Sequence, residues 1–365
     1  MKIAFFHELP IKSGSRNAVN EIAQRLITKH HVDLYYTDSE KNNSEKKFFT
    51  KTYFYKINPV QWNGNNWKNR LIRDTVELFQ LFFLHRKIAE IVRSRKYDLV
   101  FVHGSFLTES PFFLLFNNKN KIYYAHAPNY TFVFEDVVGI PKTNRLKYAY
   151  EKIIRFVRKR IDIINVRGSD QILSNSHYTK KQIAKVYKRK SSVYYLGVDT
   201  SIFKPLKVTK KWDILFVGSK HLVDGLSLYE ESKKHLTQNL KIRVLNVEEE
   251  WISNKREMSR IYNQSKILLC LAHKEPFGLM ALEGMACGIP IIAVNEAGYK
   301  ETVINNKTGF LIKRDPQELA KKIEILLKDK RKYTRMSMQS KEIARQNWNW
   351  KKQTLKFETY FSKLL

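Results

Sequence analysis

Short apolar runs alternate with helix-like segments along most of this chain. The runs 3–7, 98–103 and 121–126, and later 212–217 and 266–271, have the length of buried parallel strands. The stretches between them repeat apolar residues every three or four positions, which is typical of helices that cover a sheet. This alternation predicts an α/β protein with helices packed on parallel sheets.

The chain has 365 residues, which exceeds the size at which a single hydrophobic core stops growing. We therefore expect two domains, and the alternation in each half predicts that both are doubly wound and Rossmann-like. The first domain should cover residues 1–195 and the second residues 212–345. The segment 196–211, which contains Pro205, is expected to link them.

Basic residues dominate the charge: 66 Lys and Arg stand against 35 Asp and Glu, for a formal net charge of +31. Such a surplus favours an anionic partner, either a nucleic acid or a membrane surface. No recognisable nucleic-acid-binding module accompanies the charge, so we expect no nucleic-acid partner, and a nucleic-acid binder is only a less favoured alternative suggested by charge alone.

The expected location is the cytoplasm, with the protein soluble or peripheral on a membrane. The two cysteines, Cys270 and Cys287, lack metal-type spacing with histidine, and both are expected to be buried thiols. The first apolar run is too short for a signal peptide, and no stretch has the roughly 18 apolar residues of a membrane span.

The stretch 273–290, HKEPFGLMALEGMACGIP, contains the most informative local pattern. It predicts a loop and a short helix that begins near Gly278 and Leu279, placed between two strands. The first N–H groups of a helix have no intrahelical partner and favour a bound anion such as phosphate. The helical spacing predicts that Leu279 faces the sheet.

Two carboxylates flank this helix start: Glu275 precedes it and Glu283 lies in its second turn. Carboxylates beside an anion site can accept hydrogen bonds from hydroxyl groups, so the combination fits a sugar nucleotide. The alternative is structural: Glu275 caps the loop, and Glu283 only complements the helix dipole.

The two glutamates separated by seven residues, followed by MACGIPIIAVNEAGYKETVINNKTGFLI, resemble the donor-binding signature of the retaining glycosyltransferases of family 4, which have the GT-B fold. The similarity extends upstream through NSHYTKKQIAKVYKRKSSVYYLGVDTSIFKP and covers most of residues 120–350. It implies that a hexose moves from a nucleotide-diphosphate sugar to a lipid-linked or polysaccharide acceptor. It also implies that the two Rossmann-like domains face each other across a cleft and that a helix within 346–365 crosses back to the first domain.

The resemblance assigns roles to the residues around the short helix. Glu283 would hold the ribose hydroxyls and Glu275 the transferred sugar, as catalytic residue. Backbone N–H groups of Phe277, Gly278 and Leu279 would surround the distal phosphate, so that the leaving diphosphate meets preorganised donors. No Asp-x-Asp motif occurs, so we expect neither a metal nor a cofactor other than the donor itself.

The first half of the chain contributes three further candidates near the carboxyl ends of expected strands, where ligands collect in open α/β sheets. Gly14, in the loop after the first strand, corresponds to the family's acceptor-side loop. His126, in YYAHAPN, resembles the family histidine that reaches the donor sugar and its phosphate. His103 has only its strand-end position, and a structural role is the alternative for both histidines.

One departure from the family concerns the diphosphate. Relatives carry an Arg after the first strand of the second domain and a Lys five positions later, but this chain has Ser219 and Asp224 there. Either Lys220, or failing that Lys274, takes over the phosphate contact, or turnover is weak. An accessory subunit that binds a nucleotide sugar is therefore the alternative function.

The segment 145–161 has apolar residues at helical spacing with cations on the other side, which is typical of a basic amphipathic helix. Two hypotheses follow: the helix binds the anionic inner face of a membrane, or it is an ordinary solvated helix. The long helical stretch 67–96 is rich in Phe, and some of these side chains could form an apolar surface patch.

Overall fold

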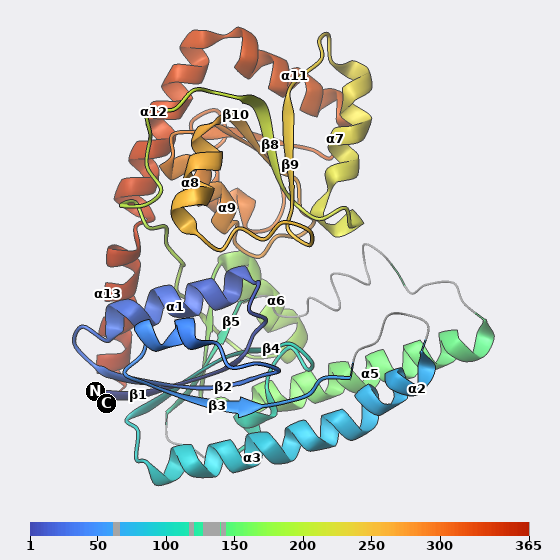
Figure 1. The fold of residues 1–365 in the computed structure, drawn as a ribbon, viewed down its shortest axis with the longest axis vertical. Coiled ribbons are helices and arrows are strands. Elements are labelled where there is room, and N and C mark those ends of the chain that lie inside the picture. The colour runs from blue at the N-terminus through green and yellow to red at the C-terminus, as the bar shows by residue number, and fades with distance from the viewer. Residues whose placement is uncertain (61–65, 117–119, 127–138, 140–143, 365) are drawn as a thin grey trace.

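The computed structural model describes residues 1–60, 66–116, 120–126, 139 and 144–364. They form two parallel β-sheets, each with helices packed against it (Figure 1). The seven-stranded sheet has the order β3-β2-β1-β4-β5-β6-β7, and the five-stranded sheet has the order β12-β11-β10-β8-β9. The predicted α/β fold with two doubly wound units is confirmed.

The seven-stranded sheet is built from the first half of the chain. Its strands are β1 (Lys2–Glu8), β2 (His31–Asp38), β3 (Lys51–Lys56), β4 (Leu99–Ser105), β5 (Lys121–Ala125), β6 (Gln171–Ser174) and β7 (Ser192–Val193). The helices around it are α1 (Gly14–Leu26), α2 (Trp67–Ile72), α3 (Leu78–Ser94), α5 (Arg145–Arg167) and α6 (His177–Tyr187). Side chains on both faces of β1 are buried, which explains its continuous apolar run.

The five-stranded sheet is built from the second half. Its strands are β8 (Trp212–Gly218), β9 (Ile242–Asn246), β10 (Ser265–Cys270), β11 (Ile291–Val294) and β12 (Gly309–Ile312). Its helices are α7 (Leu226–Ser232), α8 (Lys255–Asn263), α9 (Leu279–Ala286), α10 (Tyr299–Thr302), α11 (Pro316–Lys328) and α12 (Lys330–Asn347). Cys270 and Cys287 are buried free thiols, as predicted.

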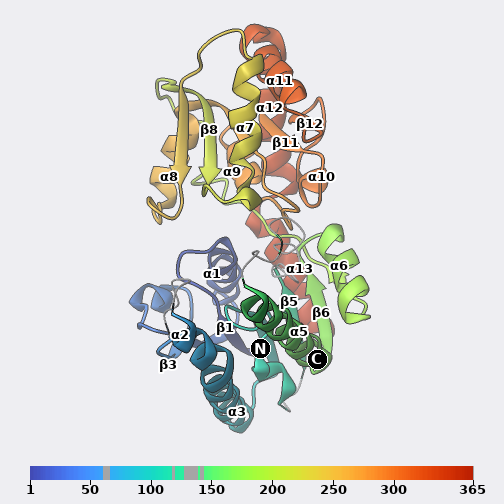
Figure 2. The same cartoon turned by 90° about the vertical axis from the view of Figure 1, so that its right-hand side faces the viewer.

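The last helix, α13 (Trp350–Lys363), returns to the first sheet, as Figures 1 and 2 show. Its buried Phe357 and Phe361 rings lie 6.1 and 5.1 Å from the ring of Phe101 in β4. Trp350 packs so closely on Gly197 that a Cβ at Gly197 would lie 2.8 Å from the Trp350 backbone. Only glycine allows this approach, which joins the segment after β7 to the start of α13.

Two long helices, α3 and α5, lie side by side at the end of the molecule that is remote from the second sheet (Figures 1 and 2). The segment that leads into α3 is fixed to α5 by two ion pairs: Arg70 of α2 contacts Glu151 at 3.1 Å, and Asp74, between α2 and α3, pairs with Arg158. In the part of the chain that the structure describes, no helix is long and apolar enough to cross a membrane.

Candidate active site

A cavity of about 430 Å³ lies between the two sheets and is lined by residues from both. Seven of the ten candidate residues proposed from the sequence line it, namely Gly14, His126, Glu275, Phe277, Gly278, Leu279 and Glu283. They follow the carboxyl ends of β1, β5 and β10. The other three, His103, Lys220 and Lys274, are not among the lining residues.

Helices α1 and α9 approach each other at this cavity. Gly14 is the first residue of α1, and a Cβ there would lie 4.0 Å from Cδ1 of Leu279 in α9. The prediction that Leu279 faces the sheet is wrong, because α9 begins beyond the sheet edge and its first turn meets the cavity. Only later residues of the helix, such as Leu282, are fully buried in the core.

The start of α9 is held by the carboxylate of Glu275. One oxygen, Oε1, accepts hydrogen bonds from the backbone N–H of Gly278 at 3.0 Å and of Phe277 at 3.4 Å. Burial raises the pKa of Glu275, and these two bonds oppose that rise. Two of the three N–H groups that the sequence assigns to phosphate, those of Phe277 and Gly278, therefore already bind the protein's own Glu275 carboxyl group.

Gly278 has a left-handed backbone with φ of +94°, which L side chains rarely adopt. A Cβ at this position would also lie 2.9 Å from the ring of Tyr299. Glycine is required here for both reasons, and it lets the chain turn from the Glu275 loop directly into α9.

Glu283 is fixed by a tyrosine. Its Oε2 accepts a hydrogen bond from the hydroxyl of Tyr262 in α8 at 2.9 Å. Burial raises the pKa of Glu283 to about 7; the Tyr262 bond and Lys255 lower it, and Glu21 raises it further. The sequence reasoning missed these three neighbours, since they come from α1 and α8 and no local motif marks them.

The two candidate histidines lie at the ends of adjacent strands. His103 Nδ1 and His126 Nε2 are 3.0 Å apart, and both side chains are buried. Burial lowers the pKa of His126 to about 3, so the ring is neutral near pH 7. The backbone oxygen of His126 accepts a bond from Asn175 Nδ2 at 2.6 Å, which holds the residue at the cavity wall.

The loop that carries Ser219 and Asp224 is closed on itself. The Asp224 carboxylate accepts hydrogen bonds from both the backbone N–H and the hydroxyl of Ser219. Lys220, the next residue, has a side chain that is 74% exposed, and its carboxylate neighbour is the equally solvated Glu249 at 3.9 Å. The structure thus places Lys220 in solvent, away from the other site residues.

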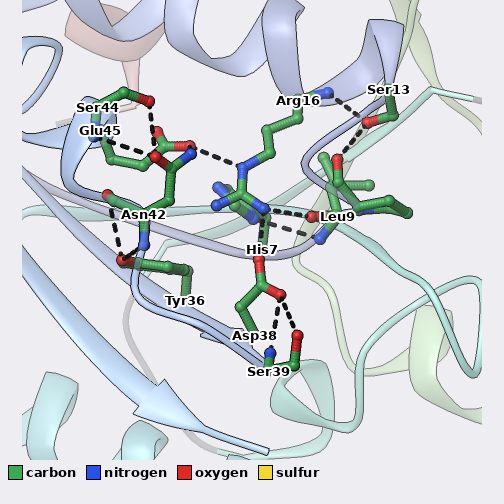
Figure 3. Close-up of polar contacts among 11 residues, drawn as sticks. His7, Leu9, Ser13, Arg16, Tyr36, Asp38, Ser39, Asn42, Ser44 and Glu45 are labelled. Atoms are coloured by element: carbon green, nitrogen blue, oxygen red, sulfur yellow. Dashed lines mark hydrogen bonds and ion pairs between the residues drawn. The ribbon is translucent and has the colours of Figure 1, made fainter. Parts of the chain in front are cut away.

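Beneath the start of α1, the buried Arg16 connects three segments of the first half (Figure 3). Its Nε binds Glu45 at 2.7 Å, and its Nη1 binds Asp38 at 2.7 Å and the backbone oxygen of Leu9 at 2.8 Å. Ser13 caps the helix through the Arg16 N–H. This cluster fixes the β1–α1 loop that presents Gly14 to the cavity.

Family models match this chain in both halves. Residues 12–202 match the model of Glycosyltransferase Family 4, and residues 176–343 match Glycosyl transferases group 1. The chain therefore belongs to glycosyltransferase family 4, and the fold with its cavity between two sheets is the GT-B architecture of such enzymes.

Individual relatives agree with this assignment. The chain is 24% identical over 335 residues to an uncharacterized 41.2 kDa protein in the cps region of Klebsiella pneumoniae, covering 83% of each chain. It is also 24% identical to the alpha-1,3/1,6-mannosyltransferase ALG2 of Dictyostelium discoideum, covering 74% of this chain and 76% of that one. Anabaena HepE, solved in complex with UDP-glucose, has a similar fold, with a TM-score of 0.70 at 15% identity and 100% coverage of both chains.

Proposed function

We propose that this glycosyltransferase moves a hexose from a nucleotide-diphosphate sugar to a polysaccharide or lipid-linked acceptor, with retention at the anomeric carbon. The observation that carries the proposal is the convergence of Glu275, Glu283 and the start of α9 on one cavity. HepE binds UDP-glucose and ALG2 is named a mannosyltransferase, so both relatives support a hexose. The cps region of the Klebsiella relative supports a glycan acceptor.

In this proposal the donor lies along α9. Glu283, oriented by Tyr262, accepts hydrogen bonds from the ribose hydroxyls, and Glu275 contacts the transferred sugar. The N–H groups of Phe277, Gly278 and Leu279 stabilise the distal phosphate, which requires the Glu275 carboxylate to give up its capping bonds when the donor binds. Charge that develops on the leaving diphosphate is then met by the helix start.

The remaining parts of the site have simpler roles. His126 contacts the sugar and its phosphate from the first half, and the loop at Gly14 faces the acceptor. We leave Lys220 out of the binding set because its side chain is in solvent. The proposal includes no metal and no cofactor beyond the donor, since the sequence has no Asp-x-Asp motif.

We further propose that the enzyme works on the inner face of a membrane, where its surplus of positive charge meets anionic lipid. Helix α5 presents exposed apolar side chains, among them Leu146 at 84% and Ile153 at 63% exposure. Its two acids, Glu151 and Asp162, are buried, so charge on its exposed surface is positive. This combination favours an anionic membrane over water or a nucleic acid.

The neighbouring α3 also has exposed apolar side chains. Phe79 and Phe83, one helical turn apart, are 68% and 59% exposed, and the exposed cations Arg86 and Lys87 follow them. Aromatic side chains next to cations bind well at the level of lipid headgroups. Helices α3 and α5 lie at the end of the molecule remote from the second sheet, so docking through them leaves the second sheet away from the membrane (Figure 1).

A second candidate function, that of an accessory subunit which binds but does not turn over a nucleotide sugar, is favoured by one observation. The loop that carries phosphate-binding cations in relatives is closed here by the Ser219–Asp224 bonds. Burial is the main cause that raises the pKa of Glu275, and the Asp224 carboxylate raises it further. A negative charge therefore lies near the proposed phosphate site.

A transfer assay separates these candidates. Purified protein is incubated with radiolabelled UDP-glucose or GDP-mannose and a lipid extract, while donor binding is followed by protection against thermal unfolding. Transfer with retained anomeric configuration supports the enzyme, and protection without transfer supports the accessory subunit. The absence of both transfer and protection, with every donor tested, would overturn both candidate functions.

A further inference from the structure

At the junction of the two halves, a carboxylate of the second half caps a helix of the first. Glu301 lies in α10, and its Oε2 accepts a hydrogen bond from the backbone N–H of His177 at 2.9 Å. Its Oε1 accepts one from the backbone N–H of Tyr178, also at 2.9 Å. His177 and Tyr178 are the first residues of α6, where N–H groups have no partner within the helix. The hydroxyl of Tyr195 donates a third bond to Oε2 at 3.0 Å.

The residue before α6 contacts the loop that presents Glu275. Ser176 is the N-cap of α6, because its Oγ accepts a bond from the backbone N–H of Thr179 at 2.9 Å. The same hydroxyl donates to the backbone oxygen of Pro276 at 2.7 Å. The preceding backbone oxygen, that of Glu275, accepts a bond from the N–H of Gly298 in its own half at 2.8 Å. The Glu275 loop is therefore held by both halves.

The same segment also holds the first-half wall of the cavity. Asn175 lines the cavity and donates from Nδ2 to the backbone oxygen of His126 at 2.6 Å. Residues 175–178 thus contact His126 on one side and, on the other, Pro276 and Glu301 of the second half. This short segment sets the spacing between the two walls of the cavity.

The contact lies where the chain passes between the halves. Tyr195 directly precedes the linking segment 196–211, and Trp348 lies just before α13. The rings of Tyr195, Trp348 and Phe277 pack together, with centroids 5.2 to 6.0 Å apart. Two connected bodies move least relative to each other near the segments that join them. The bond between Tyr195 and Glu301 therefore places the Glu301 carboxylate at the pivot of the two halves.

We propose that Glu301 is a positioning residue for sugar transfer: by capping α6 from the second half, it fixes the Glu275 loop against the wall that carries His126. The inference rests on the proposed function for the reaction. The donor is bound mainly by Glu283 and the start of α9, which belong to the second half alone, so donor affinity depends little on this contact. Transfer requires the acceptor side at a defined distance from the donor sugar, and a misplacement of about 1 Å can lower the rate about a hundredfold.

Two substitutions of Glu301 test this role by kinetics. Glu301→Ala removes both bonds to α6, and we expect kcat to fall about ten- to a hundredfold while the KM for the donor changes less than about threefold. Glu301→Gln keeps one acceptor oxygen for one of the two N–H groups, so it should recover part of the loss. If both variants keep the kcat of the unmodified enzyme, or if only KM rises, Glu301 merely caps α6 and the inference is wrong.

The matched control is Asp315→Ala. Asp315 also caps a helix with its carboxylate, which accepts the N–H groups of Gln317 at 2.8 Å and Glu318 at 3.3 Å. That helix, α11, belongs to its own half, and Asp315 does not line the cavity. The variant should therefore lose stability in urea unfolding, as Glu301→Ala does, but keep its kcat. An equal fall in kcat in both variants would mean that lost capping alone is responsible, and would overturn the inference.

The spacing of the two halves can be measured without any activity. The two native cysteines are buried, so spin labels can be attached selectively at Lys185→Cys in α6 and Lys341→Cys in α12, both at exposed positions. Pulsed electron spin resonance then gives the distribution of distances between the labels. We expect this distribution to broaden or shift in Glu301→Ala and to stay unchanged in Asp315→Ala.

An unchanged distribution in Glu301→Ala would show that the carboxylate does not fix the halves, and the inference would fail. If the unmodified protein transfers no sugar, the proposed function fails instead. The distance measurement still decides in that case whether Glu301 sets the spacing of the two halves.

Discussion

Lys255 of α8 and Glu21 of α1 form an ion pair that connects the two halves of the chain beside the cavity. Both residues line the cavity, and both act on the pKa of Glu283: Lys255 lowers it and Glu21 raises it. The pKa of the proposed ribose-binding carboxylate therefore depends on residues from both halves of the chain.

Donor affinity is expected to rise with pH through neutrality. Burial raises the pKa of Glu283 to about 7, and only the ionised carboxylate offers all its acceptor sites to the ribose. The dissociation constant should increase, by up to about tenfold per pH unit, as pH falls well below 7. Calorimetric titration with UDP-glucose between about pH 5.5 and 8.5 measures this dissociation constant. The same dependence of the dissociation constant on pH in Glu283→Gln would contradict the assignment.

The same shift has the opposite sign for folding. A carboxyl whose folded pKa is raised from 4.5 to about 7 contributes stability that is fully present below about pH 4.5 and lost as pH rises through 7. Glu283→Gln should therefore lose less stability than the unmodified protein between these pH values. Urea unfolding at pH 5 and pH 8 gives the comparison.

Glu275→Gln should lower turnover more than binding. The amide oxygen of Gln can still accept the N–H groups of Gly278 and Phe277, so α9 stays capped. The negative charge near the reacting sugar is lost, which should reduce kcat at least tenfold with a small change in KM. Glu283→Gln is the matched comparison and should mainly raise KM; near-normal kinetics in both variants would remove the site assignment.

Restoring cations to the β8 loop should strengthen donor binding. The double change Ser219→Arg and Asp224→Lys removes the closed Ser219–Asp224 contact and supplies two charges. Charge-assisted bonds of roughly 1.5–3 kcal/mol predict a gain of about ten- to a hundredfold in affinity. Lys220→Ala is the control and should change affinity less than about twofold, because the side chain is solvated. Unchanged donor affinity in the double variant would mean that the diphosphate binds elsewhere.

The enzyme is expected to sediment with phosphatidylglycerol vesicles, to ignore phosphatidylcholine vesicles, and to be released by high salt. Ile153→Gln with Phe79→Ser should weaken this binding, since both side chains are exposed on the proposed face. Leu355→Gln, an exposed apolar residue on α13, is the control and should bind normally. Binding that does not depend on lipid charge would leave α5 as a solvated helix.

Arg16→Met should destabilise the first half by roughly 3–5 kcal/mol, because it leaves the buried Glu45 without its cation. Urea unfolding measures the loss, and adding Glu45→Gln should recover part of it. Lys12→Met, at an exposed position in the same loop, should leave the free energy of unfolding unchanged. A neutral Arg16→Met would mean that the cluster in Figure 3 does not stabilise the β1–α1 loop.

Local patterns determined most of the secondary structure and the class of ligand. The apolar runs 3–7, 98–103, 121–126, 212–217 and 266–271 became β1, β4, β5, β8 and β10. Residues of one strand or one helix turn are neighbours whatever the tertiary fold, so their spacing is readable in the sequence. For the same reason Glu275, Gly278 and Glu283 could be predicted to lie together around one helix start, and all three line the cavity.

Contacts between distant segments were decided only by the tertiary structure. The order of β1, β4 and β5 in the sheet brings His103 to His126, and the approach of α8 to α1 brings Lys255 to Glu21. Nothing in the sequence around Arg16 distinguishes it from an ordinary exposed helix residue. It is buried because β2 and the segment after it supply its partners Asp38 and Glu45. The side chain of Leu279 meets the cavity because of where α9 begins relative to the sheet. Helical spacing contains no information about the position of that helix start in the fold.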